Sequence, residues 1–125
     1  MSSQGTFVWN ELATSDVEGA RKFYTEVIGW SVEAVDMEGG GQYNILKDGD
    51  EMQGGMMSTD DMPGDVPPHW MAYIGVDDVD ATCAKVTAAG GQVVHGPFDV
   101  SGVGRLAVIM DPQGAVVSIM KEANT

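Results

Sequence analysis

The sequence has few basic residues: six Lys and Arg stand against 19 Asp and Glu, which gives a formal net charge of −13. A chain this acidic repels nucleic-acid phosphates and anionic membrane surfaces, so neither is expected as a partner. A cationic ligand would be attracted to it. A charged surface that only keeps the protein soluble is the favoured explanation of the same excess.

The sequence also lacks a second cysteine and any long apolar run. The lone Cys83 excludes an internal disulfide, which is typical of a reducing compartment, and its place on the apolar stripe of a predicted helix indicates a buried thiol. No apolar run approaches the ~20 residues that a membrane span needs. The N-terminus shows neither the basic region nor the apolar core of a signal peptide. We therefore expect a cytoplasmic protein.

The chain does contain one pattern twice, 62 residues apart. Asp16-Val17 recurs as Asp78-Val79, and Gly29 recurs as Gly91. The offset is half of the 125 residues, a length that suits one ordinary domain. A repeat this long, present only twice, predicts two equal modules that close on each other and leave a site between them.

Hydrophobic periodicity predicts the same order of elements in both modules, one strand, one helix and three strands. In the first module these are a strand at 6–14, a helix capped by Ser15 or Asp16 and ended by Gly29, and strands at 30–36, 42–47 and 52–58, with Gly39–Gly41 as a turn. In the second they are a strand at 69–76, a helix capped by Asp77 or Asp78 and ended by Gly90-Gly91, and strands at 92–96, 105–110 and 115–121. The chain is thus a single α+β domain of residues 1–125, with modules 6–58 and 69–121 and a linker at 59–68.

Two short motifs resemble those of the vicinal oxygen chelate superfamily, which includes glyoxalases, bleomycin-resistance proteins and extradiol dioxygenases. Asp16-Val17, Phe23-Tyr24 and Ile28-Gly29 resemble its first signature, and the turn that begins at Asp111-Pro112 resembles its second. The stretches 69–82 and 104–115 are similar to actinobacterial glyoxalase-like proteins. The resemblance covers residues 7–120. It implies two βαβββ modules forming an incompletely closed eight-stranded barrel with two flanking helices, and a homodimer in which the modules pair within one chain or between chains.

The chain departs from that family where its members usually hold a divalent metal. Counted from the helix caps and the turn motifs, the four ligand positions are Trp9, Gly55, Met71 and Ser118. None of these supplies an imidazole, thiolate or carboxylate, the donors that such metals need. We predict that the usual metal is absent and expect no cofactor, with a divalent metal possible only at a shifted site.

Three polar residues lie two positions from a ligand position or share its strand face: Glu11, His69 and Tyr73. Glu11 and His69 are candidate catalytic residues, either as a general acid and base or as two ligands of a shifted metal site. Each also has a purely structural interpretation. A hydrogen bond with Tyr73 or Trp9 would satisfy a buried Glu11, and a histidine that starts a strand is commonly a half-exposed edge residue.

Three hypotheses about function follow. The first is a glyoxalase-like or bleomycin-resistance-like module that binds a small apolar or aromatic molecule in the barrel cavity. The second is a metal-dependent lyase, isomerase or dioxygenase with a shifted site on Glu11 and His69. The third is an interaction protein whose cavity is filled by its own side chains. For the first, the predicted ligand-binding residues are Trp9, Glu11, Met57, His69, Met71, Tyr73 and Ser118.

Arg105 is a separate candidate, because few other cations lie near it in the sequence. It holds either a surface carboxylate or the anionic group of a ligand, and the surface ion pair is the favoured interpretation.

Overall fold

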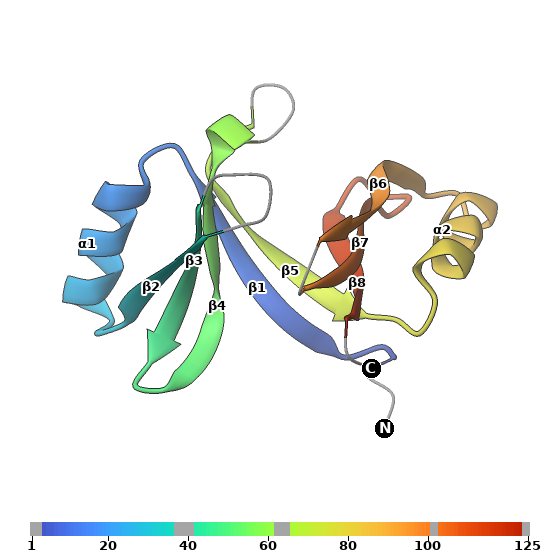
Figure 1. Cartoon of the computed structure of the whole chain (residues 1–125). Coiled ribbons are helices and arrows are strands. Elements are labelled where there is room, and N and C mark those ends of the chain that lie inside the picture. The colour runs from blue at the N-terminus through green and yellow to red at the C-terminus, as the bar shows by residue number, and fades with distance from the viewer. Residues whose placement is uncertain (1–3, 37–41, 62–65, 101–102, 124–125) are drawn as a thin grey trace. The chain divides into compact units, whose positions relative to one another are not determined.

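The computed structural model describes residues 4–36, 42–61, 66–100 and 103–123. Over these residues the chain forms a strand, a helix and three strands, and then repeats that order (Figure 1). The α+β class and the two βαβββ modules are therefore confirmed. The predicted turn at Gly39–Gly41 and positions 62–65 of the predicted linker lie outside the described residues. No helix in the described ranges is long and apolar enough to cross a membrane.

The chain divides into two compact units. The first unit is Trp9–Met71, and the second unit combines Met1–Val8 with Ala72–Thr125. Hydrogen bonds tie the N-terminal residues to the second unit: the Gly5 N–H donates to the Gly75 carbonyl at 2.8 Å, and the Gly75 N–H donates to the Thr6 carbonyl at 2.7 Å. The first residues of the chain thus pair with a strand that starts more than sixty residues later.

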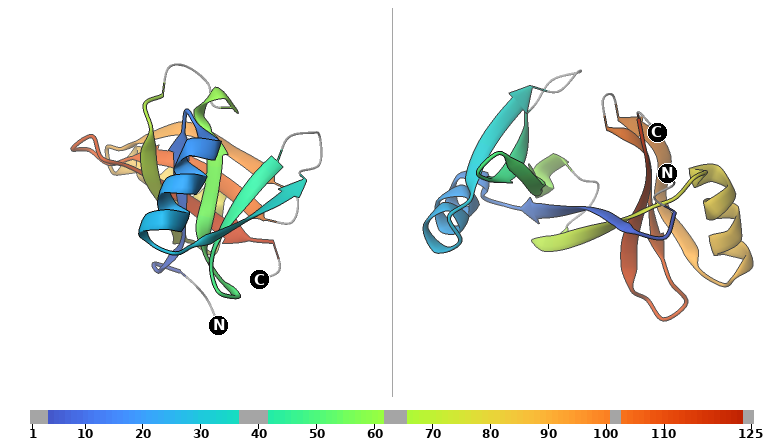
Figure 2. Two further views of the ribbon diagram at one scale, coloured as in Figure 1. Left: turned by 90° about the vertical axis from the view of Figure 1, so that its left-hand side faces the viewer. Right: turned by 90° about the horizontal axis from the view of Figure 1, so that it is seen from below.

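Four strands of the first unit lie in the order β2-β3-β4-β1, with α1 across one face of the sheet (Figure 2). β1 and β4 run parallel, and the other neighbours run antiparallel. A short 3-10 turn, Thr59–Asp61, follows β4. The elements are β1 Phe7–Thr14, α1 Val17–Val27, β2 Ser31–Asp36, β3 Gln42–Asp48 and β4 Glu51–Ser58.

The second unit repeats this arrangement with strand order β5-β8-β7-β6 and α2 across one face. Here β5 and β8 are the parallel pair. The elements are β5 His69–Gly75, α2 Val79–Ala88, β6 Gln92–Val100, β7 Gly104–Met110 and β8 Val116–Glu122. The boundary between the units passes through β5, so its residues up to Met71 belong to the first unit.

Both helices begin at an aspartate of the repeated motif. The Asp16 carboxylate accepts a hydrogen bond from the Gly19 N–H, and Asp78 accepts one from the Ala81 N–H, each at 2.9 Å. Each aspartate thereby satisfies one of the N–H groups that the first helical turn leaves without an intrahelical acceptor. The choice that the sequence left open is decided in favour of Asp16 and Asp78, which are equivalent in the repeat.

Each helix covers a separate apolar core. In the first unit, Leu12, Leu46 and Met56 are buried against Val17 and Ala20 of α1. Because side chains alternate along a strand, the neighbours of Leu12 and Met56 point to the opposite face of the sheet. That face, which we call the ligand face, carries Trp9, Glu11, Gly55 and Met57.

The second core lies under α2 and consists of Val76, Val79, Cys83, Ala107 and Ile119. Burial raises the pKa of the Cys83 thiol, so this cysteine is a poor nucleophile. The prediction of a buried thiol is confirmed. By the same alternation, Ser118 and Met120 lie on the ligand face of the second unit.

One predicted boundary is wrong. The sequence pattern ends a strand at Gly96, before Pro97, whereas β6 continues to Val100. Its pairing with β7 shifts register between Val93 and His95 and again between His95 and Phe98. Such irregularities give proline a place without a ladder hydrogen bond, so the strand passes through it.

Candidate functional site

The strand registers give Gly55 and Ser118 the same place in their units. In the first unit Glu11 lies opposite Gly55, and in the second Tyr73 lies opposite Ser118. The two pairs involve the parallel strands β1–β4 and β5–β8. The predicted ligand positions are therefore equivalent in structure as well as in the repeat.

The Gly55 position is filled by a side chain from the neighbouring strand. A Cβ atom on Gly55 would collide with the hydroxyl and ring of Tyr43. Gly55 pairs with Ile45 across β3 and β4, so Tyr43 is the diagonal neighbour on the same face. Because Gly55 has no side chain, the Tyr43 phenol can occupy the space beside it.

Tyr43 links Trp9 and Glu11 in a chain of hydrogen bonds. The Trp9 Nε1–H donates to the Tyr43 hydroxyl oxygen at 2.9 Å, and the Tyr43 O–H donates to Glu11 Oε2 at 2.7 Å. Glu11 is buried, with 9% of its surface exposed. A buried carboxylate is costly unless donors surround it, and the phenol is one such donor. Sequence reasoning named Trp9 and Glu11 and missed the tyrosine that connects them.

The other predicted residues of the first unit are less enclosed. His69 and Met71 on β5 and Met57 on β4 are each partly buried. The His69 Nδ1 lies 2.8 Å from the Pro67 carbonyl oxygen, a distance that suits an Nδ1–H donating to it. The ring is thus held by the backbone of the segment that precedes its own strand.

In the second unit, Ser118 combines burial with an unsatisfied hydroxyl. It is 1% exposed, and among the described residues its Oγ has no hydrogen-bond partner. Leaving a buried hydroxyl unpaired costs about 1–3 kcal/mol. Tyr73, opposite it, is also buried, with 9% exposed.

Arg105 holds two surface carboxylates. Its Nε and Nη2 donate to the two oxygens of Asp80 at 2.9 and 3.0 Å, and its Nη1 donates to Asp99 at 3.0 Å. These hydrogen bonds hold the pKa of the Asp80 carboxyl below its usual value and raise the pKa of Arg105. The predicted surface ion pair is confirmed.

Replacing Arg105 with Met is expected to lower stability slightly near neutral pH. Because the pKa of Asp80 is depressed in the folded state, the stabilisation is complete above the ordinary aspartate pKa of about 3.9 and is lost as the pH falls through the lower folded value. Urea unfolding of both proteins at pH 7 and in strong acid measures this. A stability difference that is unchanged in acid would contradict the assignment.

Comparison with known proteins agrees with this architecture. Residues 6–119 match the model of the Glyoxalase/Bleomycin resistance protein/Dioxygenase superfamily. The chain belongs to this superfamily. Its glyoxalase-like fold also resembles the crystal structure of methylmalonyl-CoA epimerase from Mycobacterium tuberculosis, with a TM-score of 0.65, 17% identity, and coverage of 98% of this chain and 92% of that one.

Two relatives differ in how much of their own length matches this chain. "Putative glyoxylase CFP32" of Mycobacterium tuberculosis is 47% identical over 98% of this chain, but the match covers only 46% of that protein. The chain therefore spans about half the length of this relative. A "Probable lactoylglutathione lyase" of Vibrio parahaemolyticus is 31% identical over 95% of this chain and 92% of its own length.

The residues at the four predicted ligand positions do not fit a divalent metal. Trp9 has no free lone pair and already donates its N–H to Tyr43, Gly55 has no side chain, and Met71 offers only a soft thioether. Ser118 offers a neutral hydroxyl. In the described part of the chain, no group of three or more His, Cys, Asp or Glu is placed to hold a metal ion.

Proposed function

We propose that this glyoxalase-superfamily protein binds a small, apolar or aromatic molecule on the ligand face of the first unit, without the divalent metal. The proposal rests mainly on the position of Tyr43. Its phenol occupies the space beside Gly55 and donates a hydrogen bond to the Glu11 carboxylate. The face offers the Trp9 indole and the flexible Met57 and Met71 as apolar contacts. The Tyr43–Glu11 pair is the polar group that orients the ligand.

The test uses the neutral aromatic probe N-phenyl-1-naphthylamine, whose fluorescence rises on entering an apolar site. We expect saturable binding of one probe per chain, with a shift of the Trp9 indole signal in the NMR spectrum. Met57→Asp should weaken binding at least about tenfold, because a charge then faces the apolar probe. Binding that leaves Trp9 unperturbed would contradict the proposal.

The matched control is Met52→Asp. Met52 lies on the same strand as Met57 but is 59% exposed, so this variant should bind the probe like the parent protein. The milder Met57→Gln, which keeps the side-chain length, separates loss of binding from loss of fold, and circular dichroism checks the fold of each variant. Equal loss with Met52→Asp would place the probe elsewhere.

The lyase named among the relatives supports a second candidate function, because the match spans nearly its whole length. Under that alternative, Glu11 and His69 would act as general base and general acid on the precursor of the lactoylglutathione thioester. Lactoylglutathione formation is the assay. Activity that is lost in Glu11→Gln and kept in the exposed Glu18→Gln would favour the enzyme over the binding module.

We also propose that Tyr73 and Ser118 form a ligand-contacting site of their own on the ligand face of the second unit, since the buried Ser118 hydroxyl has no hydrogen-bond partner among the described residues. A cytoplasmic homodimer stays part of this proposal, and light scattering on the purified protein measures the oligomeric state.

A further inference from the structure

A hollow lies within the first unit, away from the ligand face. It has a volume of about 330 Å³ and is lined by Asn10, Trp30, Leu46, Gln53 and Trp70. Leu46 belongs to the core under α1, and Asn10 alternates with Trp9 and Glu11 along β1. Gln53 lies at the register shift between β3 and β4, which interrupts the alternation that places Gly55 and Met57 on the ligand face. The hollow therefore opens on the helix-covered face of the sheet, opposite to the face that carries Trp9, Glu11 and Gly55.

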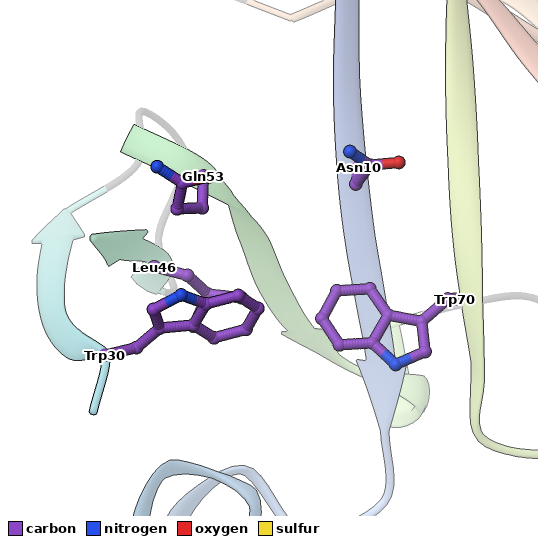
Figure 3. A pocket seen from close by; sticks show the side chains of 5 residues that line it. All are labelled: Asn10, Trp30, Leu46, Gln53 and Trp70. Atoms are coloured by element: carbon purple, nitrogen blue, oxygen red, sulfur yellow. The ribbon is translucent and has the colours of Figure 1, made fainter. Parts of the chain in front are cut away.

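Aromatic side chains dominate this hollow. Figure 3 shows the Trp30 and Trp70 side chains pointing toward each other, with Asn10 and Gln53 beside them. The two indole rings are 6.2 Å apart and inclined at 72°. Tyr24 stacks on Trp30 at 5.6 Å and meets Trp70 edge-on at 5.6 Å. Trp70 is 45% exposed, so an aromatic surface is open to solvent.

The angle between the two indole rings indicates which ligand shape fits the hollow. A flat ring is sandwiched by parallel aromatic planes, whereas two indoles inclined at 72° form a corner that suits a compact, rounded group. Indole faces attract cations through their quadrupole, and clusters of aromatic side chains bind quaternary ammonium groups. The volume lies near the lower end of the ~300–1,000 Å³ typical of small-molecule sites.

The charge of the surrounding segment favours a cation as well. Residues 9–71 contain 13 of the acidic residues and 3 of the basic ones, so this segment carries −10 of the net charge of −13. The residues that line the hollow are themselves uncharged, with two side-chain amides and no carboxylate. A primary ammonium would lose water there without gaining an ionic partner, whereas a quaternary ammonium needs no hydrogen bonds.

We propose that the Trp30–Trp70 hollow is a binding site for a free small molecule with a quaternary ammonium group. The indoles contact the cation. A hydroxyl on the same ligand donates its proton to the side-chain carbonyl oxygen of Asn10 or Gln53 and accepts from the amide N–H of the other. This site is independent of the proposed function, because it uses other residues on the other face of the sheet.

The test is an NMR titration with choline chloride, read on the three indole N–H signals of the full chain. We expect the Trp30 and Trp70 signals to shift together and the Trp9 signal to stay fixed. The neutral isostere 3,3-dimethyl-1-butanol should bind about tenfold more weakly, since it lacks the charge. Equal binding of the isostere, a shift of Trp9 instead, or no shift at all would each overturn the proposal.

Variants of Trp70 sharpen the result. Trp70→Leu should weaken choline binding about tenfold, and Trp70→Phe should restore most of it, because the phenyl ring keeps an aromatic face. Phe7→Leu, which replaces an aromatic residue that is 72% exposed, is the matched control and should leave choline binding unchanged. Choline should not displace N-phenyl-1-naphthylamine, which keeps failure of this proposal distinct from failure of the first. Co-sedimentation with phosphatidylcholine vesicles would assign the site to a lipid surface and overturn the free ligand.

Discussion

Gly55→Ala is expected to destabilise the protein by about 3 kcal/mol and to lower Tm by roughly 10 °C. The added Cβ takes the space of the Tyr43 hydroxyl and ring, so the tyrosine must leave its place on the sheet. Its departure removes the hydrogen bonds that join it to Trp9 and Glu11 and leaves a buried carboxylate with one donor fewer. Urea unfolding of parent and variant measures the loss.

The control for this prediction is the same change in a Tyr43→Ala background. There the new methyl group enters the space that the ring has left, so Gly55→Ala should cost less than about 1 kcal/mol. A cost that is equal in the two backgrounds would mean that Tyr43 does not occupy the Gly55 position, and the proposed ligand face would lose its main support.

Met56→Ala is expected to cost about 3 kcal/mol of stability, and Met57→Ala about 1 kcal/mol or less. The two methionines are neighbours on β4. Met56 is 0% exposed in the core under α1, whereas Met57 is partly buried on the opposite, ligand face. Thermal or urea unfolding gives both values, and N-phenyl-1-naphthylamine binding should show the reverse order of effects.

This pair of variants tests the assignment of faces. A stability loss from Met57→Ala as large as that from Met56→Ala would mean that both side chains belong to a packed core. The ligand face would then be filled by the protein's own side chains, which is the third of the hypotheses that the sequence left open.

Most of what the sequence predicted about the fold came from the internal repeat. Because Asp16 and Asp78 cap their helices in the same way, and because Glu11–Gly55 and Tyr73–Ser118 pair in the same register, counting along the sequence located equivalent positions. Local capping and strand alternation are short-range effects, so a single sequence contains them. The end of β6 was missed because the irregular pairing past Pro97 depends on the neighbouring strand.

Tyr43 was missed for a related reason. A glycine at a ligand position shows that a side chain is lacking there and does not show what fills the space. The available signal was the diagonal pairing of Tyr43 with Gly55 across β3 and β4, since aromatic rings commonly cover glycines on an adjacent strand. The Trp30–Trp70 hollow was also beyond reach, because it joins the end of α1 to the start of β5, forty residues apart in the sequence.

The central proposal is that the protein keeps the duplicated fold of its superfamily and binds no divalent metal, because the described residues place no set of side chains able to chelate one. The most direct measurement is the metal content of the purified protein, followed by calorimetric titration with Zn²⁺, Mn²⁺, Ni²⁺ and Fe²⁺. We expect well below one metal ion per chain and no saturable binding at one equivalent. One equivalent of tightly bound metal, lost in Glu11→Gln or His69→Ala and kept in Glu18→Gln, would contradict the account.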